Sequence, residues 1–153
     1  MINTALVENI YRKDRRAIAR AISLIESDNN ITSEYLKQIY SKVGNSQRIG
    51  ITGPPGAGKS TITNQLTKQF RKQNKNVGII AVDPTSPFTG GALLGDRVRM
   101  NDIGMDEGVF IRSMATRGSL GGLSKKAIDA ADVLDAAGFD IIIFETVDRK
   151  SVV

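Results

Sequence analysis

The sequence predicts an α/β protein in which a parallel sheet, with helices on both faces, follows an N-terminal helical segment. Up to about residue 46, apolar residues recur at helical spacing. From residue 47 onward, short apolar runs alternate with longer helical stretches, a pattern typical of a parallel sheet. The run from Val77 to Val82 is continuously apolar, as expected of a strand that is covered on both faces.

Composition limits the function classes that need to be considered. The 153 residues carry 21 Lys and Arg against 16 Asp and Glu, which gives a net charge of +5. There is no Cys and no His, so disulfide frameworks, zinc hydrolases and Ser-His or Cys-His nucleophiles are excluded. The apolar run at residues 141–144 is far shorter than the roughly 20 residues of a membrane span. We expect a cytoplasmic protein with no membrane partner, because the N-terminus also lacks a secretion signal.

The densest basic stretch, formed by Lys68, Arg71, Lys72 and Lys75, raises the question of nucleic-acid binding. Single-stranded nucleic acid is bound by aromatic side chains that stack on its bases, and only Phe70 lies nearby. We interpret the stretch as the solvated face of a surface helix and expect no nucleic-acid partner.

Residues 1–46 are predicted to form the N-terminal helical segment. Its first apolar stripe comprises Leu6, Ile10, Ala17, Ile18, Ala21, Ile22 and Ile25. Residues 27–30 interrupt the pattern, and Thr32 is the expected cap of a second helix. Gly44 is expected to end that second helix. Its predicted buried stripe comprises Tyr35, Leu36, Ile39, Tyr40 and Val43.

Residues 47–147 are predicted to form a partial α/β domain. The expected strands cover residues 48–52, 77–82, 109–114 and 139–147. The expected helices cover residues 60–73, 96–102 and 123–137.

Between the first strand and the first helix of this domain lies a phosphate-binding motif. Residues 53–60, GPPGAGKS, fit the pattern G-x-x-x-x-G-K-[ST] in full, and the strand and helix around them are the required context. Glycines let the backbone N–H groups wrap a polyphosphate, while the helix start adds its positive end. Lys59 is expected to bind the outer phosphates and the Ser60 hydroxyl to ligate Mg²⁺. The predicted nucleotide-binding residues are Gly53, Pro54, Pro55, Gly56, Ala57, Gly58, Lys59, Ser60 and Thr61.

Two carboxylates follow strands whose carboxyl ends are expected near this loop. Asp83 ends the second predicted strand and Glu145 lies near the end of the fourth. Ligands of open parallel sheets bind beyond the carboxyl ends of the strands, and Mg²⁺ prefers oxygen ligands. Asp83 is equally well explained as a turn former before Pro84. By position alone, Asp96 fits a helix cap better than a metal ligand.

The loop and several further segments together resemble the MeaB/ArgK family of P-loop GTPases. These segments are residues 81–87 (AVDPTSP), 89–100 (TGGALLGDRVRM), 110–113 (FIRS), 136–140 (AAGFD) and 145–147 (ETV). The resemblance covers nearly all of residues 1–147. It implies a P-loop NTPase fold, incomplete in this chain, behind an N-terminal helical segment.

The resemblance also implies a function. Members of the family hydrolyse GTP to GDP and phosphate with Mg²⁺, and assist adenosylcobalamin-dependent methylmalonyl-CoA mutase as a GTPase chaperone. Ser60, Asp83, Asp96 and Glu145 match the metal-site and switch residues of the family, which favours a metal role for Asp96. Lys59 and Glu145 take the catalytic roles. Residues 83–96 would be the nucleotide-sensing switch, with Gly90 and Gly91 as its hinge.

The sequence departs from the family after Val147, where residues 148–153 read DRKSVV. The family continues with Gly-Val-Gly-Gln-Ser-Glu, then with an Asn-Lys-x-Asp motif that reads guanine and with C-terminal helices that form a homodimer. We therefore interpret the chain as a fragment that lacks the dimerisation region. One hypothesis makes residues 148–153 an artefact, since a common sequencing-adapter sequence encodes them; a natural frameshift or variant tail is the alternative.

Two other functions stay open on the sequence. The chain could be a non-catalytic nucleotide-binding fragment, because the residues that read the base are absent. It could also be an ATP-dependent kinase linked to amino-acid transport, which is an older label of the same family. The preference for GTP over ATP rests on the resemblance alone.

Overall fold

The computed structural model describes residues 4–27, 30, 32–54, 56, 58–83, 101–115 and 125–147. The N-terminal helices are α1 (Thr4–Tyr11), α2 (Arg15–Glu26) and α3 (Thr32–Ile39), followed by a 3₁₀ turn, η1 (Tyr40–Lys42). The rest comprises β1 (Gln47–Gly53), α4 (Lys59–Lys72), β2 (Val77–Asp83), α6 (Asn101–Gly104), β3 (Val109–Ala115), α7 (Lys125–Ala136) and β4 (Ile141–Val147). None of the helices within these ranges has the length and apolar character that crossing a membrane requires.

The four strands form one parallel sheet in the order β1-β4-β2-β3. This confirms the predicted α/β class with a parallel sheet behind N-terminal helices. The observed strands lie where the sequence predicts them, to within one or two residues at each end. The predicted helix at 96–102 corresponds to α6, which begins at Asn101; residues 96–100 lie outside the described residues, as does the tail at 148–153.

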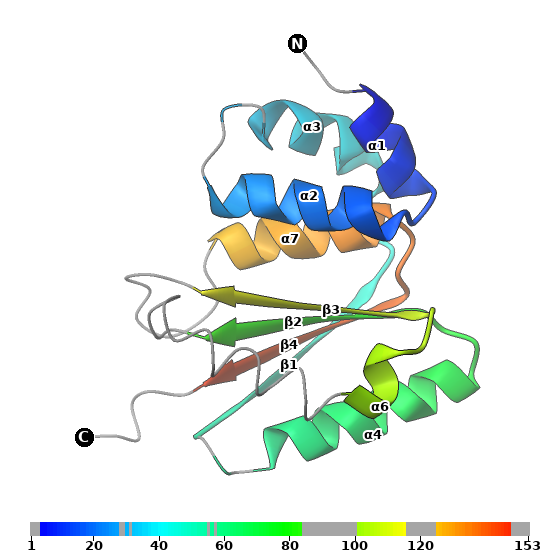
Figure 1. The fold of residues 1–153 in the computed structure, drawn as a ribbon, viewed down its shortest axis with the longest axis vertical. Coiled ribbons are helices and arrows are strands. Elements are labelled where there is room, and N and C mark those ends of the chain that lie inside the picture. Colours follow the sequence, from blue (N-terminus) through cyan, green and yellow to red (C-terminus); the bar gives the residue numbers. More distant parts are fainter. Residues whose placement is uncertain are drawn as a thin grey trace.

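The sheet separates two layers of helices (Figure 1). Helix α7 covers one face, and α1, α2 and α3 pack on its far side; α4 and α6 lie on the other face. The strand β4 alternates between these layers, as a buried parallel strand must. Ile142 and Phe144 belong to the larger core cluster with α7 and the N-terminal helices, whereas Ile141 and Ile143 belong to the smaller cluster beneath α4.

The N-terminal segment contains a break that the apolar periodicity does not reveal. The predicted first helix is two helices, because Lys13 takes a positive φ of 61° between α1 and α2. Asp14 then caps α2, since its carboxylate accepts a hydrogen bond from the Arg16 N–H at 3.2 Å. Side-chain caps of this kind stabilise a helix start by about 1 kcal/mol. The apolar stripe stays buried across the break, as predicted.

Two predictions for the second helix are wrong. The side chain of Tyr40 is 73% exposed and not buried, because the chain tightens into a 3₁₀ turn at Tyr40 and shifts the phase of the stripe. Thr32 is the first helical residue of α3, and its hydroxyl donates to the Leu24 carbonyl at 3.1 Å. Thr32 therefore ties α3 to the end of α2.

A buried carboxylate on α7, that of Asp135, binds residues 44–46, which connect the N-terminal helical segment to β1. Asp135 accepts hydrogen bonds from the backbone N–H groups of Gly44, Asn45 and Ser46 at 2.9–3.2 Å, and from the Ser46 hydroxyl at 2.8 Å. Arg48 on β1 lies 3.3 Å away. Burial alone would raise the pKa of Asp135, but the donors from Gly44, Ser46, Asn45 and Arg48 outweigh it and hold the pKa below its ordinary value.

Candidate functional site

The glycine-rich loop runs from the end of β1 to the start of α4, so it lies at the carboxyl edge of the sheet. Gly56 and Gly58 take φ values of +82° and +91°, which L side chains rarely adopt. A Cβ at either position would meet nothing within 4 Å. These two glycines are therefore required for their backbone conformation, and not to make room among protein atoms. Pro55 and Ala57 lie outside the described residues.

Among the described residues, no side chain caps the start of α4. Gly58 occupies the N-cap position, where it has no side chain to accept from the first N–H groups of the helix. The helix then begins with Lys59 and Ser60, whose N–H groups precede the first i→i−4 bonds. An uncapped helix start with its positive dipole end is a general binding site for phosphate groups. Thr61 lies beside them with an exposed side chain.

Lys59 is nearly buried, with 9% of its surface exposed. Its Nζ donates a hydrogen bond to the Pro54 carbonyl at 3.1 Å, so the side chain folds back over the loop that precedes it. An ammonium group has three donors, and one bond to the loop does not exhaust them. The arrangement places a cation beside Pro54, at the beginning of the loop, where a polyphosphate would need charge neutralisation.

Glu145 is the buried carboxylate of the site, with 6% of its surface exposed. It lies near the end of β4, in register with Ile51 of β1 and Ala81 of β2. The Ser60 hydroxyl donates to its Oε1 at 3.3 Å, and the Thr63 Oγ1 lies 3.0 Å from its Oε2. The structure thus brings together two of the residues that the sequence predicts for a metal site, Ser60 and Glu145.

The other two predicted metal residues are not placed in the same way. Asp83 ends β2, on the strand next to β4, so its backbone lies at the same edge of the sheet. Asp96 lies outside the described residues. In the described ranges no group of three or more His, Cys, Asp and Glu side chains is placed to hold a metal ion. The Ser60 hydroxyl and the Glu145 carboxylate are oxygen donors next to each other, which fits Mg²⁺ with water as its remaining ligands.

Sequence reasoning missed two further residues of the site region, Thr63 and Thr67. Both side chains are fully buried on the sheet side of α4, and each hydroxyl oxygen lies within hydrogen-bond distance of the carbonyl four residues earlier, at 2.9 Å and 2.7 Å. The signal was present in the sequence, because the two residues are four apart and follow Lys59 at the same interval, so all three share one helix face.

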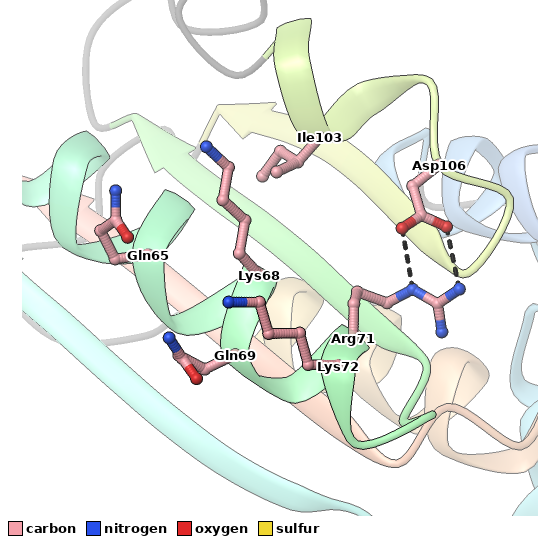
Figure 2. A pocket seen from close by; sticks show the side chains of 7 residues that line it. All are labelled: Gln65, Lys68, Gln69, Arg71, Lys72, Ile103 and Asp106. Carbon is pink, nitrogen blue, oxygen red and sulfur yellow. Dashed lines mark hydrogen bonds and ion pairs between the residues drawn. The ribbon is translucent and has the colours of Figure 1, made fainter.

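A depression lies between α4 and the segment that contains α6 (Figure 2). It measures about 370 Å³ and is lined by Gln65, Lys68, Gln69, Arg71, Lys72, Ile103 and Asp106. Arg71 is only partly exposed there, and its guanidinium forms two hydrogen bonds with the Asp106 carboxylate, at 2.9 and 3.0 Å. Lys68 and Lys72 are exposed. This region is therefore the basic, mostly solvated helix face that the sequence predicts, with one arginine used for packing.

Comparisons with known proteins identify relatives along most of the chain. A Pyrococcus horikoshii protein is 58% identical over 142 residues, which cover 93% of this chain and 45% of that protein. The GTPase ArgK of Escherichia coli is 42% identical over 155 residues, covering 96% of this chain and 47% of ArgK. A solved LAO/AO transport system kinase superposes with a TM-score of 0.76 at 30% identity, covering 96% of this chain and 45% of that one. The chain thus spans about half the length of the relatives it matches.

A family model described as methylmalonyl Co-A mutase-associated GTPase MeaB matches residues 18–150. The match includes the glycine-rich loop, Lys59 and Glu145. It also extends over most of the N-terminal helical segment, so the family likeness is not confined to the phosphate-binding motif. The chain belongs to the MeaB family of GTPases.

Proposed function

We propose that this chain binds GTP together with Mg²⁺ through residues 53–61, and that the whole protein hydrolyses GTP to GDP and phosphate. The observation that carries the proposal is the contact between Ser60, at the start of α4, and the buried Glu145, at the end of β4. This contact joins the phosphate-binding loop to a carboxylate at the edge of the sheet where ligands of parallel sheets bind.

The residues of the chain would act mainly by holding charge. Phosphoryl transfer needs in-line positioning and neutralisation of the negative charge on the transferred group. In our proposal the N–H groups of the loop and of the α4 start bind the inner phosphates, and Lys59 moves from the Pro54 carbonyl to the outer phosphates. A covalent nucleophile is not required by this chemistry.

The metal would be held by the Ser60 hydroxyl and by Glu145, directly or through water, with Asp83 and Asp96 as further ligands. Mg²⁺ supplies additional neutralisation of the phosphate oxygens. Glu145 would keep the Ser60 hydroxyl turned toward the site. Residues 83–96 would change conformation with the nucleotide state, as order–disorder switches of GTPases do.

The partner proposal follows from the family, whose description names a mutase-associated GTPase. We propose that the whole protein acts on methylmalonyl-CoA mutase as a GTPase chaperone, and that regions beyond this chain form its homodimer. Mutase pull-down with the full-length gene product, in GTP and in GDP, tests this part. Equal capture in both nucleotides would contradict a nucleotide-dependent chaperone.

The binding test uses the 153-residue chain and calorimetry with GTP, ATP and MgCl₂. Lys59→Ala should weaken GTP binding by at least about tenfold, since a charge-assisted bond to phosphate is worth roughly 1.5–3 kcal/mol. Lys72→Ala is the matched control, because Lys72 is an exposed lysine on the same helix, away from the loop. A wild-type chain that binds neither nucleotide, while its circular dichroism shows a folded protein, would contradict the proposal.

A non-catalytic binding role is the second candidate, supported by the position of β1 at the edge of the described sheet and by the half-length coverage. Phosphate release separates the candidates. Release by the wild-type chain, lost in Lys59→Ala, indicates hydrolysis; binding without release indicates a binding module. Phosphate found on a small-molecule acceptor instead of in solution would indicate a kinase.

A further inference from the structure

Thr63 occupies a position that the nucleotide site does not by itself explain. It lies three residues after Ser60 on α4, its side chain is fully buried, and its Oγ1 lies 3.0 Å from Glu145 Oε2. Ser60 contacts the other oxygen, Oε1, at 3.3 Å. The two hydroxyls of one helix therefore contact the two oxygens of one carboxylate, and fix the rotation of its plane.

The contact has a direction that follows from hydrogen-bond chemistry. The Thr63 hydroxyl has one proton and two acceptors in reach, Glu145 Oε2 and the Lys59 carbonyl at 2.9 Å. The Lys59 carbonyl already faces the Thr63 N–H within the helix. An ionised carboxylate is the stronger acceptor, and a buried one is costly without donors. The proton is therefore directed to Glu145.

We propose that Thr63 is a positioning residue for the metal site, which holds Oε2 of Glu145 so that Oε1 stays beside the Ser60 hydroxyl. This rests on the proposed function, because it assigns Ser60 and Glu145 to Mg²⁺. Outer-shell hydrogen bonds of this kind orient ligand groups, and their loss typically lowers metal affinity by about 10- to 100-fold. The function of Thr63 is thus to set the Mg²⁺ requirement of nucleotide binding, without touching the nucleotide.

Thr67 provides a matched comparison within the same helix. It is also fully buried, and its hydroxyl donates to the Thr63 carbonyl at 2.7 Å, the same i→i−4 geometry. This bond lies one turn further along α4, away from the loop and from Glu145. Replacement of either threonine by valine removes one hydroxyl and keeps the branched shape, but only Thr63→Val removes a contact to the carboxylate.

The test titrates Mg²⁺ into the 153-residue chain with a fluorescent N-methylanthraniloyl-GDP probe, and repeats the binding in excess EDTA. Mg²⁺ should increase the affinity for the probe, and the Mg²⁺ midpoint is the concentration that gives half of this increase. Thr63→Val should raise the midpoint by about tenfold and leave the probe affinity in EDTA within about twofold of wild type. Thr67→Val should leave both quantities within about twofold. Thr63→Ser, which keeps the hydroxyl, should restore the wild-type Mg²⁺ midpoint.

Each outcome decides between alternatives. An unchanged Mg²⁺ midpoint in Thr63→Val overturns the inference and leaves the proposed function standing. Equal losses of probe affinity with and without Mg²⁺ in Thr63→Val, or equal midpoint shifts in both valine variants, indicate a structural role and also overturn it. Wild-type protein that binds no probe overturns the proposed function and the inference with it. If Thr63→Val does not fold, Thr63→Ala replaces it under the same criteria, and Thr63→Ser stays the variant that keeps the hydroxyl.

Discussion

The helices on the two faces of the sheet bury different kinds of side chain. Helix α7 buries almost only apolar residues, namely Ala127, Ala130, Ala131, Val133, Leu134 and Ala136, with Asp135 as the exception. Helix α4 has three fully buried or nearly buried residues, Lys59, Thr63 and Thr67, and all are polar. Its apolar contacts come from half-buried Leu66 and Phe70. One face therefore provides stability, and the other places chemical groups at the loop.

The largest expected effect is on the α7 face. Leu134 is fully buried and packs over Gly78 of β2, where an added Cβ would lie 2.8 Å from its Cδ1. Leu134→Ala should lower the free energy of unfolding by about 2–5 kcal/mol, through lost burial and the cavity left behind. Urea unfolding measures the loss. Nucleotide affinity at 10 °C should stay unchanged in the folded fraction, and a clear loss there would contradict the division between the faces.

The next effect concerns Asp135, the buried charged residue of α7. Asp135→Asn should cost about 1–3 kcal/mol, because an amide accepts fewer of the hydrogen bonds that residues 44–46 donate. Since the pKa of Asp135 is lowered in the folded protein, its stabilisation is complete above the ordinary pKa of about 4 and is lost as the pH falls from there through the lower pKa of the folded protein. Urea unfolding from pH 7 to pH 3 should show a shallower acid decline in Asp135→Asn than in wild type. Parallel declines would contradict this role.

A smaller effect is expected from two glycine substitutions, which test the phosphate-binding loop. Gly58→Ala and Gly44→Ala place a Cβ in open space at φ values of +91° and +108°, so each should cost about 1–2 kcal/mol of stability through backbone strain. Only Gly58→Ala should also weaken nucleotide binding, because Gly58 precedes the N–H groups of the α4 start. Thermal unfolding and calorimetry measure the two effects. Equal nucleotide affinity in both variants would argue against a phosphate site at this loop.

The smallest expected effect lies between α4 and the turn before β3. The hydrogen bond from the Arg71 guanidinium and, to a smaller extent, the one from the Gly108 N–H hold the pKa of Asp106 below its ordinary value. Both side chains are partly exposed, at 27% and 36%, so Arg71→Met should cost only about 0.5–1 kcal/mol. The difference from wild type should shrink in 1 M NaCl, because salt screens exposed pairs. A difference that is independent of salt would indicate that packing of the arginine stem dominates.

The sequence was sufficient to predict the α/β class, the strands and the loop, because each depends on local pattern. The continuously apolar run from Val77 to Val82 predicted a buried strand. The motif at residues 53–60 predicted a phosphate-binding loop between a strand and a helix. The order β1-β4-β2-β3 was not predictable in this way, since it depends on pairing between segments far apart in the chain. The break at Lys13 was hidden because the apolar stripe keeps its phase across it.

The candidate site was predicted in part, and the missing part has a physical cause. Ser60 and Glu145 follow from motif and position, and the structure places them in contact. Thr63 was missed because its spacing places it on the helix face of Lys59 but does not tell whether that face packs on the sheet or lies at the surface. Only the packing of α4 against β4 decides between them. The roles of these residues in nucleotide and metal binding stay predictions.

The outer edges of the two outer strands, β3 and β1, have different contacts. Arg15 of α2 donates to the carbonyl of Val109, the first residue of β3, and to the carbonyls of Asp106 and Glu107 in the turn before it, so a cation covers the start of that strand. Within the described residues, β1 pairs with β4 only, and its other side keeps its backbone groups available. Open strand margins readily recruit further strands. The edge of β1, the strand that leads into the phosphate loop, is therefore a position at which a further strand can pair with this sheet.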